Sequence, residues 1–565
     1  MTERLLKYLV EHHLITLKQA EQLRSEHRET GKSVRELLGE SGIVPEERLL
    51  DALAAVSRMP AIRLYETEIP AEVRQILKAD LMRNHMVFPF GYDPEDPSVM
   101  LVAINDPMNM KGRELVAIAS KCRIRPYLAT TTDILTTIDR YHGSQEMRKA
   151  AEMFTSRDAD AELSLEDELI REDINNSPVV VLVNSIIEQA ARQRASDIHI
   201  EPEENGVRVR YRVDGVLYVA GNYDKRLLSA IIARVKILSG LDISEKRKPQ
   251  DGRSTVSVDG KEYDIRVSTL PTVYGEKCVM RLGLKKAVSA RFSLQYLGFR
   301  PEEEALFMKI LKRPNGIVLV TGPTGSGKSR TLYTALSELN SLDVNIVTVE
   351  DPVEINLDGI NQVQVNPKAG LTFAGSLRSI LRQDPDIIMI GEIRDGETAS
   401  IAVQASITGH LVLSTLHTND TASTITRLLD MGVESYLMAD SMAGIVAKRL
   451  VRLLCPHCKR PHVLEQSEME FLELTPETAA KANVCEPVGC QRCGGRGYFE
   501  RTGVYEIMEI TPRMRNIISS RATTAELRAA AIEEGMLTLH QSARRLVLEG
   551  ETTITELMRI SGESD

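Results

Sequence analysis

Apolar positions near the start of the chain follow a helical spacing, and the pattern repeats. Three of them recur 29 positions later, so that Leu9, Leu14 and Ile15 correspond to Leu38, Ile43 and Val44. A helix-start signal follows each group, at Thr16 and at Pro45. The repeat predicts two copies of one helical hairpin, although amphipathic helices can also resemble each other by chance. We place a helix-rich N-terminal domain at residues 1–145.

The next apolar positions change from helical spacing to strict alternation. Val179–Ile187 has the period of a buried helix, and three later segments alternate as half-buried strands do: Val207–Val213, Ser254–Val258 and Tyr263–Val267. We therefore expect a second, smaller α/β domain at residues 178–288. Before it, residues 146–177 are acidic and poor in bulky apolar side chains, which predicts a flexible linker or else a solvated helix face.

Beyond residue 288 the apolar positions form short continuous runs between segments of helical period. The clearest runs are Ile317–Val320, Ile346–Val349 and Ile387–Ile390. Each run suits a strand that is buried on both faces. Strands that alternate with helices are typical of a parallel α/β core, so we predict an α/β domain at residues 289–565.

A glycine-rich loop follows the first of these runs. It has the spacing G-x-x-x-x-G-K-S and consists of Gly322, Pro323, Thr324, Gly325, Ser326, Gly327, Lys328 and Ser329, with Arg330 directly after it. Backbone amides in such a loop point at phosphate oxygens, and the following helix N-terminus favours anions. Lys328 would reach the β- and γ-phosphates of ATP, and Ser329 would ligate Mg²⁺. The motif predicts a P-loop (RecA-like) NTPase domain.

Carboxylates close the other two apolar runs. Glu392 follows the third run in the place of a Walker B acid, where it could hold the Mg²⁺ through a water. Glu350, Asp351 and Glu354 cluster after the second run. The carboxyl ends of parallel strands converge on one crevice, so one of these groups should orient or deprotonate the attacking water. Surface carboxylates that cap helices are the alternative.

Four of the seven cysteines form two C-x-x-C pairs: Cys455, Cys458, Cys490 and Cys493. Four thiolates at this spacing favour a structural, tetrahedral Zn²⁺ site, in a module at about residues 450–500. Free thiols or a redox pair are the alternatives. Cys485 and His457 are possible substitute ligands.

The composition limits the classes of partner. A formal net charge of −10 over 565 residues argues against a surface built to grip nucleic acid. Aromatic residues make up only 4% and Trp is absent, which argues against base-stacking platforms. No apolar run approaches the roughly 20 residues that span a bilayer, and the N-terminus lacks a signal-peptide core. We expect a cytoplasmic protein that reaches a membrane only through partners.

Four segments in order, GPTGSGKS, VTVEDPVE, RQDPDIIMIGEIRD and TGHLVLSTLHTND, resemble the secretion-ATPase superfamily of type II secretion and type IV pilus systems. The resemblance covers about residue 178 to the C-terminus. The segment Glu354–Phe373 is more similar to pilus-extension ATPases of the PilB type than to retraction motors. The family is hexameric, so the resemblance implies a homohexamer that couples ATP hydrolysis to mechanical work.

The resemblance also implies roles for single residues. Glu354 matches the proposed general base, Glu392 the Walker B glutamate, and His410 and His417 the histidines of a "His box" (Thr408–Asp420), which we treat as coupling residues.

Two arginines of the second domain, Arg266 and Arg281, match the residues that contact nucleotide phosphates in the family. Strand-face salt bridges are the alternative for both. The family carries the same four-cysteine zinc module.

The repeat near the start resembles N-terminal domains of these ATPases that bind cyclic di-GMP through paired RLGxxLVxxGxI motifs. Leu6 and His13 occupy the glycine positions of the first copy. In the second copy Arg35 replaces the first glycine and Ser33 the basic residue, and only Gly42 remains. Leu6 and Arg35 would block close approach of the ligand. We favour a docking role toward membrane or assembly partners, with cyclic di-GMP binding as the alternative.

Together these features predict a hexameric motor with ATP, Mg²⁺ and Zn²⁺ as cofactors. It would drive type IV pilus assembly from the cytoplasmic face of the inner membrane, through an inner-membrane platform protein. The ATPase of a type II secretion system is the nearest alternative. The two acidic clusters disfavour a non-hydrolysing scaffold, and the acidic, aromatic-poor composition disfavours a DNA-translocating ATPase.

Overall fold

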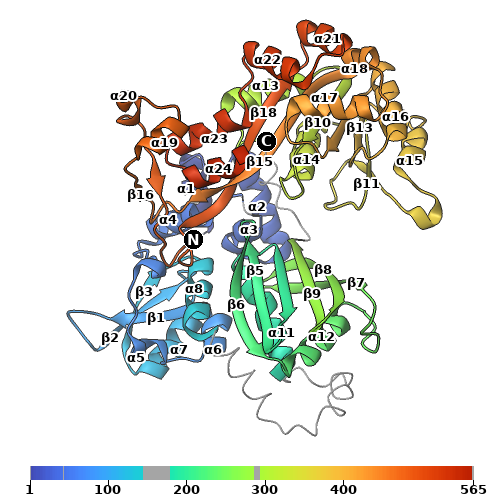
Figure 1. The fold of residues 1–565 in the computed structure, drawn as a ribbon. Helices are drawn as coiled ribbons and strands as arrows, with labels where there is room; N and C mark the ends of the chain where they lie inside the picture. Colours follow the sequence, from blue (N-terminus) through green and yellow to red (C-terminus); the bar gives the residue numbers. More distant parts are fainter. Residues whose placement is uncertain (1, 42, 144–177, 285–292, 563–565) are drawn as a thin grey trace. The chain divides into compact units, whose positions relative to one another are not determined.

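The computed structural model describes residues 2–41, 43–143, 178–284 and 293–562 (Figure 1). The acidic segment 146–177, which we predict as a linker, lies outside the described residues. The chain divides into two compact units, Met1–Ser289 and Ala290–Asp565, and each is described by itself. In the described part of the chain, no helix is both long and apolar enough to cross a bilayer.

Four helices open the first unit and share one core: α1 (Thr2–Glu11), α2 (Leu17–Thr30), α3 (Val34–Ser41) and α4 (Glu46–Ser57). The predicted helical repeat is confirmed, because its equivalent positions are buried in pairs. Leu9 and Leu38 are fully buried near the ends of α1 and α3, and Ile15 and Val44 are buried just before α2 and α4.

A small sheet and short helices complete the first 143 residues. Strand β1 pairs antiparallel with β2, and β2 pairs parallel with β3. The elements in order are η1 (Leu64–Glu66), α5 (Ala71–Arg74), α6 (Ala79–Asn84), β1 (Val87–Tyr92), β2 (Val99–Ile104), α7 (Met110–Ser120), β3 (Arg123–Leu128), α8 (Thr131–Ile138) and η2 (Asp139–Gly143).

Residues 178–284 form an antiparallel sheet of order β6-β5-β4-β9-β8-β7, with two helices on one face. The elements are α11 (Pro178–Arg192), β4 (Asp197–Pro202), β5 (Gly206–Val213), β6 (Val216–Asp224), α12 (Leu227–Leu238), β7 (Gln250–Val258), β8 (Lys261–Thr272) and β9 (Gly275–Leu284). The apolar residues of β5 alternate with arginines and point to the core beneath the helices. The opposite face of the sheet is therefore polar.

The second unit is built on a seven-stranded sheet of order β12-β11-β13-β14-β10-β15-β18. All neighbours in this sheet are parallel except β15 and β18, so the predicted parallel α/β core is confirmed. Its strands are β10 (Gly316–Thr321), β11 (Ile346–Glu350), β12 (Asn361–Gln364), β13 (Ile387–Ile390), β14 (Leu411–Leu416), β15 (Met442–Leu454) and β18 (Tyr498–Glu509).

Helices cover both faces of this sheet: α13 (Pro301–Leu311), α14 (Lys328–Leu339), α15 (Phe373–Ile380), α16 (Gly396–Ile407), α17 (Thr421–Asp430), α18 (Ser435–Ser441), α21 (Pro512–Ser519), α22 (Thr524–Glu533), α23 (Leu539–Leu548) and α24 (Ile554–Gly562). The short η5 (Pro367–Ala369), between β12 and α15, has no buried residue. A small excursion between β15 and β18 holds β16 (Arg460–Pro461), α19 (Gln466–Phe471), α20 (Pro476–Ala479) and β17 (Cys485–Glu486). The four paired cysteines lie in this excursion or at its ends.

Candidate active site

The glycine-rich loop joins β10, whose six residues are all buried, to the N-terminus of α14. The strand–loop–helix context that the sequence predicts is confirmed. Gly325 and Gly327 have φ angles of 82° and 83°, a region that favours glycine. A Cβ at Gly322 would lie 2.5 Å from the carbonyl oxygen of Lys448. No side chain caps α14, so its first amides remain available for an anion.

Lys328 is 8% exposed and folds back onto its own loop. Its Nζ donates to the carbonyl oxygens of Gly322 at 2.8 Å and Pro323 at 3.2 Å. Burial lowers the pKa of Lys328 to about 8, against an opposing effect of the Glu392 carboxylate. The ammonium group is thus held at the loop by weak acceptors that phosphate oxygens can replace.

The acidic cluster after β11 divides into a buried and an exposed part. Glu350 is buried and accepts hydrogen bonds from the Tyr333 hydroxyl, from Thr348 Oγ1 at 2.6 Å and from Gln362 Nε2 at 3.0 Å. Glu354 is exposed, and its backbone amide donates to the same Tyr333 hydroxyl at 3.2 Å. Glu350 therefore serves as a structural anchor, while the Glu354 carboxylate faces solvent.

Glu392 lies two residues beyond β13, at the same carboxyl edge of the sheet. Arg394 Nε donates to its Oε1 at 2.7 Å, and His417 Nε2 lies 3.5 Å from its Oε2. The other ring nitrogen of His417 lies 3.4 Å from Lys328 Nζ. Burial and the nearby Lys328 lower the pKa of His417, which keeps the imidazole neutral at pH 7. His417 thus bridges the phosphate loop and the Walker B acid.

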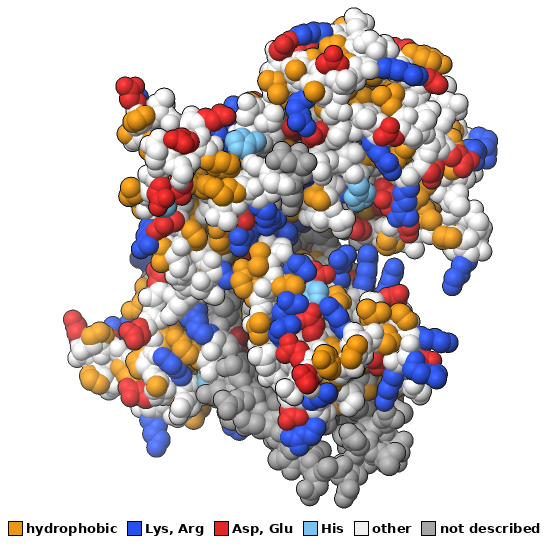
Figure 2. All heavy atoms as spheres, in the orientation of Figure 1, with side chains coloured by type: hydrophobic (Ala, Val, Ile, Leu, Met, Phe, Trp, Pro, Cys, Tyr) orange, Lys and Arg blue, Asp and Glu red, His pale blue; other side chains and the backbone are white. Residues whose placement is uncertain are grey.

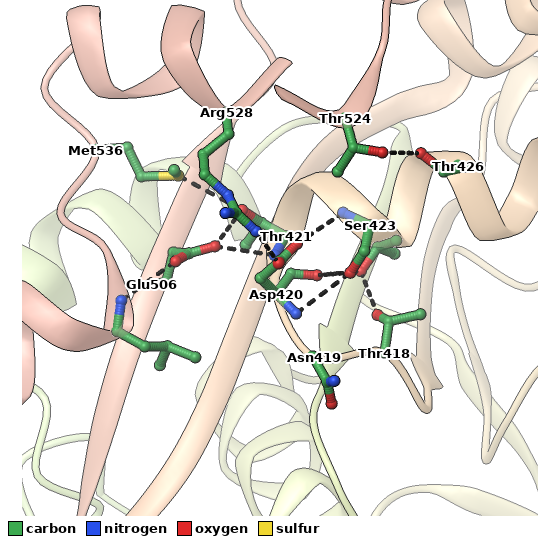
Figure 3. Close-up of polar contacts among 12 residues, drawn as sticks. Thr418, Asn419, Asp420, Thr421, Ser423, Thr426, Glu506, Thr524, Arg528 and Met536 are labelled. Carbon is green, nitrogen blue, oxygen red and sulfur yellow. Dashed lines mark hydrogen bonds and ion pairs between the residues drawn. The ribbon is translucent and has the colours of Figure 1, made fainter. Parts of the chain in front are cut away.

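The segment after His417 connects this edge to the C-terminal helices (Figure 3). The Thr418 amide donates to Thr321 Oγ1, at the end of β10, at 3.0 Å. Asp420 caps α17 and forms an ion pair with Arg528 of α22. The buried Glu506 of β18 accepts from Thr421 N at 2.9 Å and Thr421 Oγ1 at 2.6 Å, and from Leu539 N, at the start of α23, at 3.2 Å.

His410 lies away from these groups. It stands just before β14, while His417 follows the other end of the same strand. His410 Nδ1 lies 2.8 Å from the Ala405 carbonyl oxygen and 3.3 Å from Thr408 Oγ1. The structure therefore brings only one of the two predicted coupling histidines to the phosphate loop.

In the first unit, Arg266 and Arg281 belong to a row of charged residues that crosses five strands. Asp197 of β4 stands opposite Arg212 of β5 and Arg281 of β9. Arg281 stands opposite Arg266 of β8, which stands opposite Arg253 of β7. Residues directly opposite in neighbouring strands project from the same face. The row therefore holds four arginines and one aspartate on the face away from the helices.

The row lines an open hollow of about 410 Å³ with Asp197, Arg253, Arg266 and Arg281 among its walls. Arg281 Nε donates to Asp197 Oδ1 at 3.0 Å, and Arg212 Nε lies 3.6 Å from Oδ2 of the same carboxylate. Arg266 Nε also lies 3.8 Å from Asp264 Oδ2, and Asp251 lines the hollow, so these carboxylates offset part of the charge of the four arginines. Arginines that stand directly opposite each other still repel, and like charges opposite each other destabilise a sheet. Figure 2 shows Lys and Arg side chains interspersed with Asp and Glu side chains over these strands. The adjacent guanidinium groups of Arg253, Arg266 and Arg281 in this hollow suit an anion.

Sequence reasoning missed Arg253 and Arg212, which only the strand register places beside Arg266 and Arg281. The alternation Val207–Val213 predicts a strand with arginines on one face. No local signal marks Arg253 in its D-G-R-S context. Sequence reasoning also missed Tyr333, whose hydroxyl joins the helix of the phosphate loop to the segment of Glu354.

The four paired cysteines converge on one point, with all four Sγ atoms within 4.8 Å of one another. Backbone amides of Gly489 and Gly497 donate to Cys458 Sγ at 3.3 Å and to Cys493 Sγ at 3.1 Å. Burial, together with the neighbouring thiolates, raises the pKa of Cys455 to about 12. A divalent cation removes that repulsion, so the donor set fits a thiolate-bound metal. Cys485 lies outside the cluster, with its Sγ 3.8 Å from the Asn483 carbonyl oxygen.

A glycine-rich phosphate loop at the carboxyl edge of a parallel sheet, with acidic strand ends around it, defines a P-loop ATPase. The chain belongs to the Type II/IV secretion system protein family, whose profile matches residues 172–559. A second profile, the MshEN domain, matches residues 57–148.

The chain is similar to curated proteins over most of its length. It is 42% identical to the type IV pilus assembly ATPase PilB of Myxococcus xanthus, over 99% of each chain. It is 44% identical to the type II secretion system protein E of Pseudomonas aeruginosa, over 83% of this chain and 91% of that protein. The solved structure of the Yersinia pseudotuberculosis ATPase DotB matches with a TM-score of 0.51 and 23% identity, over 68% of this chain and 94% of that one. This last likeness concerns the fold alone.

Proposed function

We propose that the protein is the hexameric motor of type IV pilus assembly, which couples ATP hydrolysis to pilin polymerisation. The match to a pilus assembly ATPase along 99% of both chains carries this proposal, because it includes the N-terminal region as well as the ATPase core. The motor would act at the cytoplasmic face of the inner membrane, held there by a platform protein and other assembly proteins.

ATP would occupy the phosphate loop. The binding residues would be Gly322, Pro323, Thr324, Gly325, Ser326, Gly327, Lys328, Ser329 and Arg330. Ser329 and Glu392 would hold Mg²⁺, which neutralises phosphate charge when bound. Glu354 would act as general base, because its carboxylate is exposed while the buried Glu350 is fully hydrogen-bonded. His417 would couple the nucleotide to α17, and a role of His410 would have to act from the far end of β14.

The arginine row would supply further positive charge to the nucleotide phosphates. Arg281 and Arg266 would be its catalytic members, with Arg253 beside them in the same hollow. Loss of the γ-phosphate would remove the charge that these arginines attract, which gives hydrolysis a mechanical consequence. This role accounts for a like-charged row that a purely structural sheet would avoid.

The domain plan follows from these roles. Residues 1–145 would dock partners, 178–288 would supply arginines, and 289–565 would hydrolyse ATP, with a zinc module at about 450–500. The convergent Sγ atoms of the four cysteines support zinc. If zinc holds the module together, a chelator should increase proteolysis at 450–500 in the full-length protein, and unchanged cleavage would contradict a structural metal.

Type II secretion is the second candidate function, favoured by the 44% identity to a type II secretion system protein E. The two candidates share their chemistry and differ in their client. Deletion of the gene in its own host separates them. Loss of surface pili with normal export of secreted enzymes supports pilus assembly, and the reverse result supports secretion. Restoration by the wild-type gene, but not by one encoding Lys328→Ala, ties either result to the phosphate loop.

A further inference from the structure

A second lysine lies directly against the phosphate loop and has no part in the site described so far. Lys448 of β15 is 1% exposed. Its Nζ donates to Thr331 Oγ1 at 2.9 Å and to the Gly327 carbonyl oxygen at 3.4 Å. Gly327 precedes Lys328, and Thr331 lies in the first turn of α14. The amine is therefore fixed to the junction of the loop and its helix.

No acidic side chain in the described part of the chain forms an ion pair with Lys448. The groups around it are the Arg330 side chain of α14, the Tyr505 ring of β18, whose centroid lies 5.3 Å from Nζ, and Arg449, the next residue of its own strand. Neighbouring β10 contributes only apolar residues and Thr321. Burial raises the pKa of Tyr505 well above its usual value, so the phenol stays neutral.

A comparison within the chain shows how unusual this environment is. Lys236 of α12 is equally buried, but its Nζ lies 2.7 Å from Glu276 Oε1 and donates to the Glu245 carbonyl oxygen at 2.8 Å. A buried lysine without a carboxylate loses its hydration without compensation, so it releases its proton easily. Burial, with a smaller contribution from the nearby Arg330, lowers the pKa of Lys448 to about 7.

We propose that Lys448 is a positioning residue that takes up a proton when a nucleotide polyphosphate binds. As a cation it then stabilises the junction of the phosphate loop and α14. This inference rests on the proposed placement of the nucleotide on that loop. Bound phosphates bring negative charge close to the amine and favour its protonated form. The missing counterion of Lys448 is thus supplied by the ligand.

Protonation of Lys448 and nucleotide binding are coupled, so nucleotide affinity should depend on pH in a defined direction. Below pH 7 Lys448 already carries its proton, and binding takes up none there. Above pH 7 the empty site holds a neutral amine, so binding must draw a proton from solution and the affinity for nucleotide falls as pH rises. The fall is about tenfold for each unit by which bound phosphate raises the pKa of Lys448.

Calorimetric titration of the full-length protein with ADP in excess Mg²⁺ tests this inference. At pH 7.5, two buffers of different ionisation enthalpy report the number of protons taken up. We expect most of a proton for the wild type and a much smaller value for Lys448→Met, which keeps an unbranched chain without the charge. Lys309→Met, which removes an exposed lysine of the same unit, should match the wild type.

A wild type that takes up no proton, or a Lys448→Met variant that takes up as many as the wild type, would overturn the inference. If Lys448→Met lacks a cooperative unfolding transition, Lys448→Gln takes its place. A Lys328→Ala variant that binds ADP as tightly as the wild type would instead refute the placement of the nucleotide on the loop. The two failures are therefore distinguishable.

Discussion

The phosphate loop of the second unit buries its lysine and bonds it to the loop backbone, whereas the arginine row of the first unit places arginines opposite one another on an open face. Lys328 is 8% exposed and is held by two loop carbonyls. Arg281 has a side chain that is 67% exposed, and it shares one aspartate with Arg212. The loop is prepared for its ligand by its own backbone, while the row holds arginines opposite one another, whose mutual repulsion an anion would reduce.

This difference implies different costs of mutation. In the loop, substitution of Lys328 removes a side chain whose position is fixed by burial and by two hydrogen bonds to the loop backbone. In the row, neighbouring arginines remain when Arg281 is substituted, and the sheet beneath loses little because the Arg281 side chain lies mostly in solvent. Nucleotide binding should therefore depend on the loop, and the rate of the chemical step on the row.

The largest effect is expected for Lys328→Ala. Nucleotide binding and turnover should both fall below detection, because Lys328 is the residue that the loop itself brings to the β- and γ-phosphates. Binding of a fluorescent ADP and steady-state phosphate release would measure the two quantities. Lys309→Ala, at an exposed position on α13, is the control and should behave as wild type. Retained turnover in Lys328→Ala would remove the loop from the site.

Arg281→Ala should leave nucleotide binding nearly intact but slow turnover. An arginine that stabilises a transferring phosphoryl group is worth roughly 10³–10⁵ in rate. The melting temperature should barely change, since the side chain is largely exposed.

The matched control is Arg208→Ala. Arg208 lies on the same face of β5 but outside the row, paired with Glu203 at 2.8 Å. If both variants slow turnover equally, general positive charge and not the row is responsible. If only the melting temperature of Arg281→Ala falls, the arginine is a structural salt bridge.

Glu354→Gln should retain nucleotide binding and lose turnover by roughly 10²–10⁴, the usual contribution of a general base. Its carboxylate is exposed, so the substitution leaves no buried group unsatisfied. Single-turnover kinetics with ATP would separate chemistry from product release. Asp358→Asn, an exposed carboxylate on the same segment, should keep full activity. Turnover that survives in Glu354→Gln would move the role of base to another group, such as Glu392.

The sequence predicted best those features that depend on neighbouring residues. The phosphate loop, its flanking elements and the two cysteine pairs are local patterns, and the structure places them as expected. The register of the five strands that carry the row could not be predicted from the sequence. Arg253 was therefore missed, although it stands directly opposite Arg266. Likewise, nothing in the sequence shows that β14 separates His410 from His417.

The burial of single charged side chains could not be predicted from the sequence either. Glu350 and Glu354 belong to one acidic cluster in the sequence, yet only the structure shows that the first is enclosed by Tyr333, Thr348 and Gln362. Nothing in the sequence distinguishes Lys448 from other lysines in strands. Only the structure shows that Thr331 of α14 and Tyr505 of β18 enclose its amine. Lys448 and Thr331 are 117 positions apart, and Glu350 and Tyr333 are 17 positions apart on different elements, so no local pattern encodes either environment.

The smallest effect is expected at the contact that joins the His417 segment to the C-terminal helices. Arg528→Gln removes the ion pair with Asp420 but leaves the cap of α17, since Asp420 still accepts from Ser423 N at 2.7 Å. Asp420→Asn keeps a cap of similar quality and removes the same ion pair. The side chain of Arg528 is partly exposed, so either change should cost only about 0.2–1 kcal/mol of stability.

Turnover distinguishes a stabilising contact from a transmitting one. If Asp420 transmits the change between the ATP-bound and ADP-bound states to α22, each single variant should slow ATP turnover a few-fold without changing nucleotide affinity. The double variant should then be no slower than either single one, because both substitutions break the same link. Additive effects on turnover would mean that the two residues act separately. Unchanged turnover in all three variants would mean that the ion pair only stabilises α17 locally. Glu506, which binds both Thr421 N and Leu539 N, would then remain to connect this segment to α23.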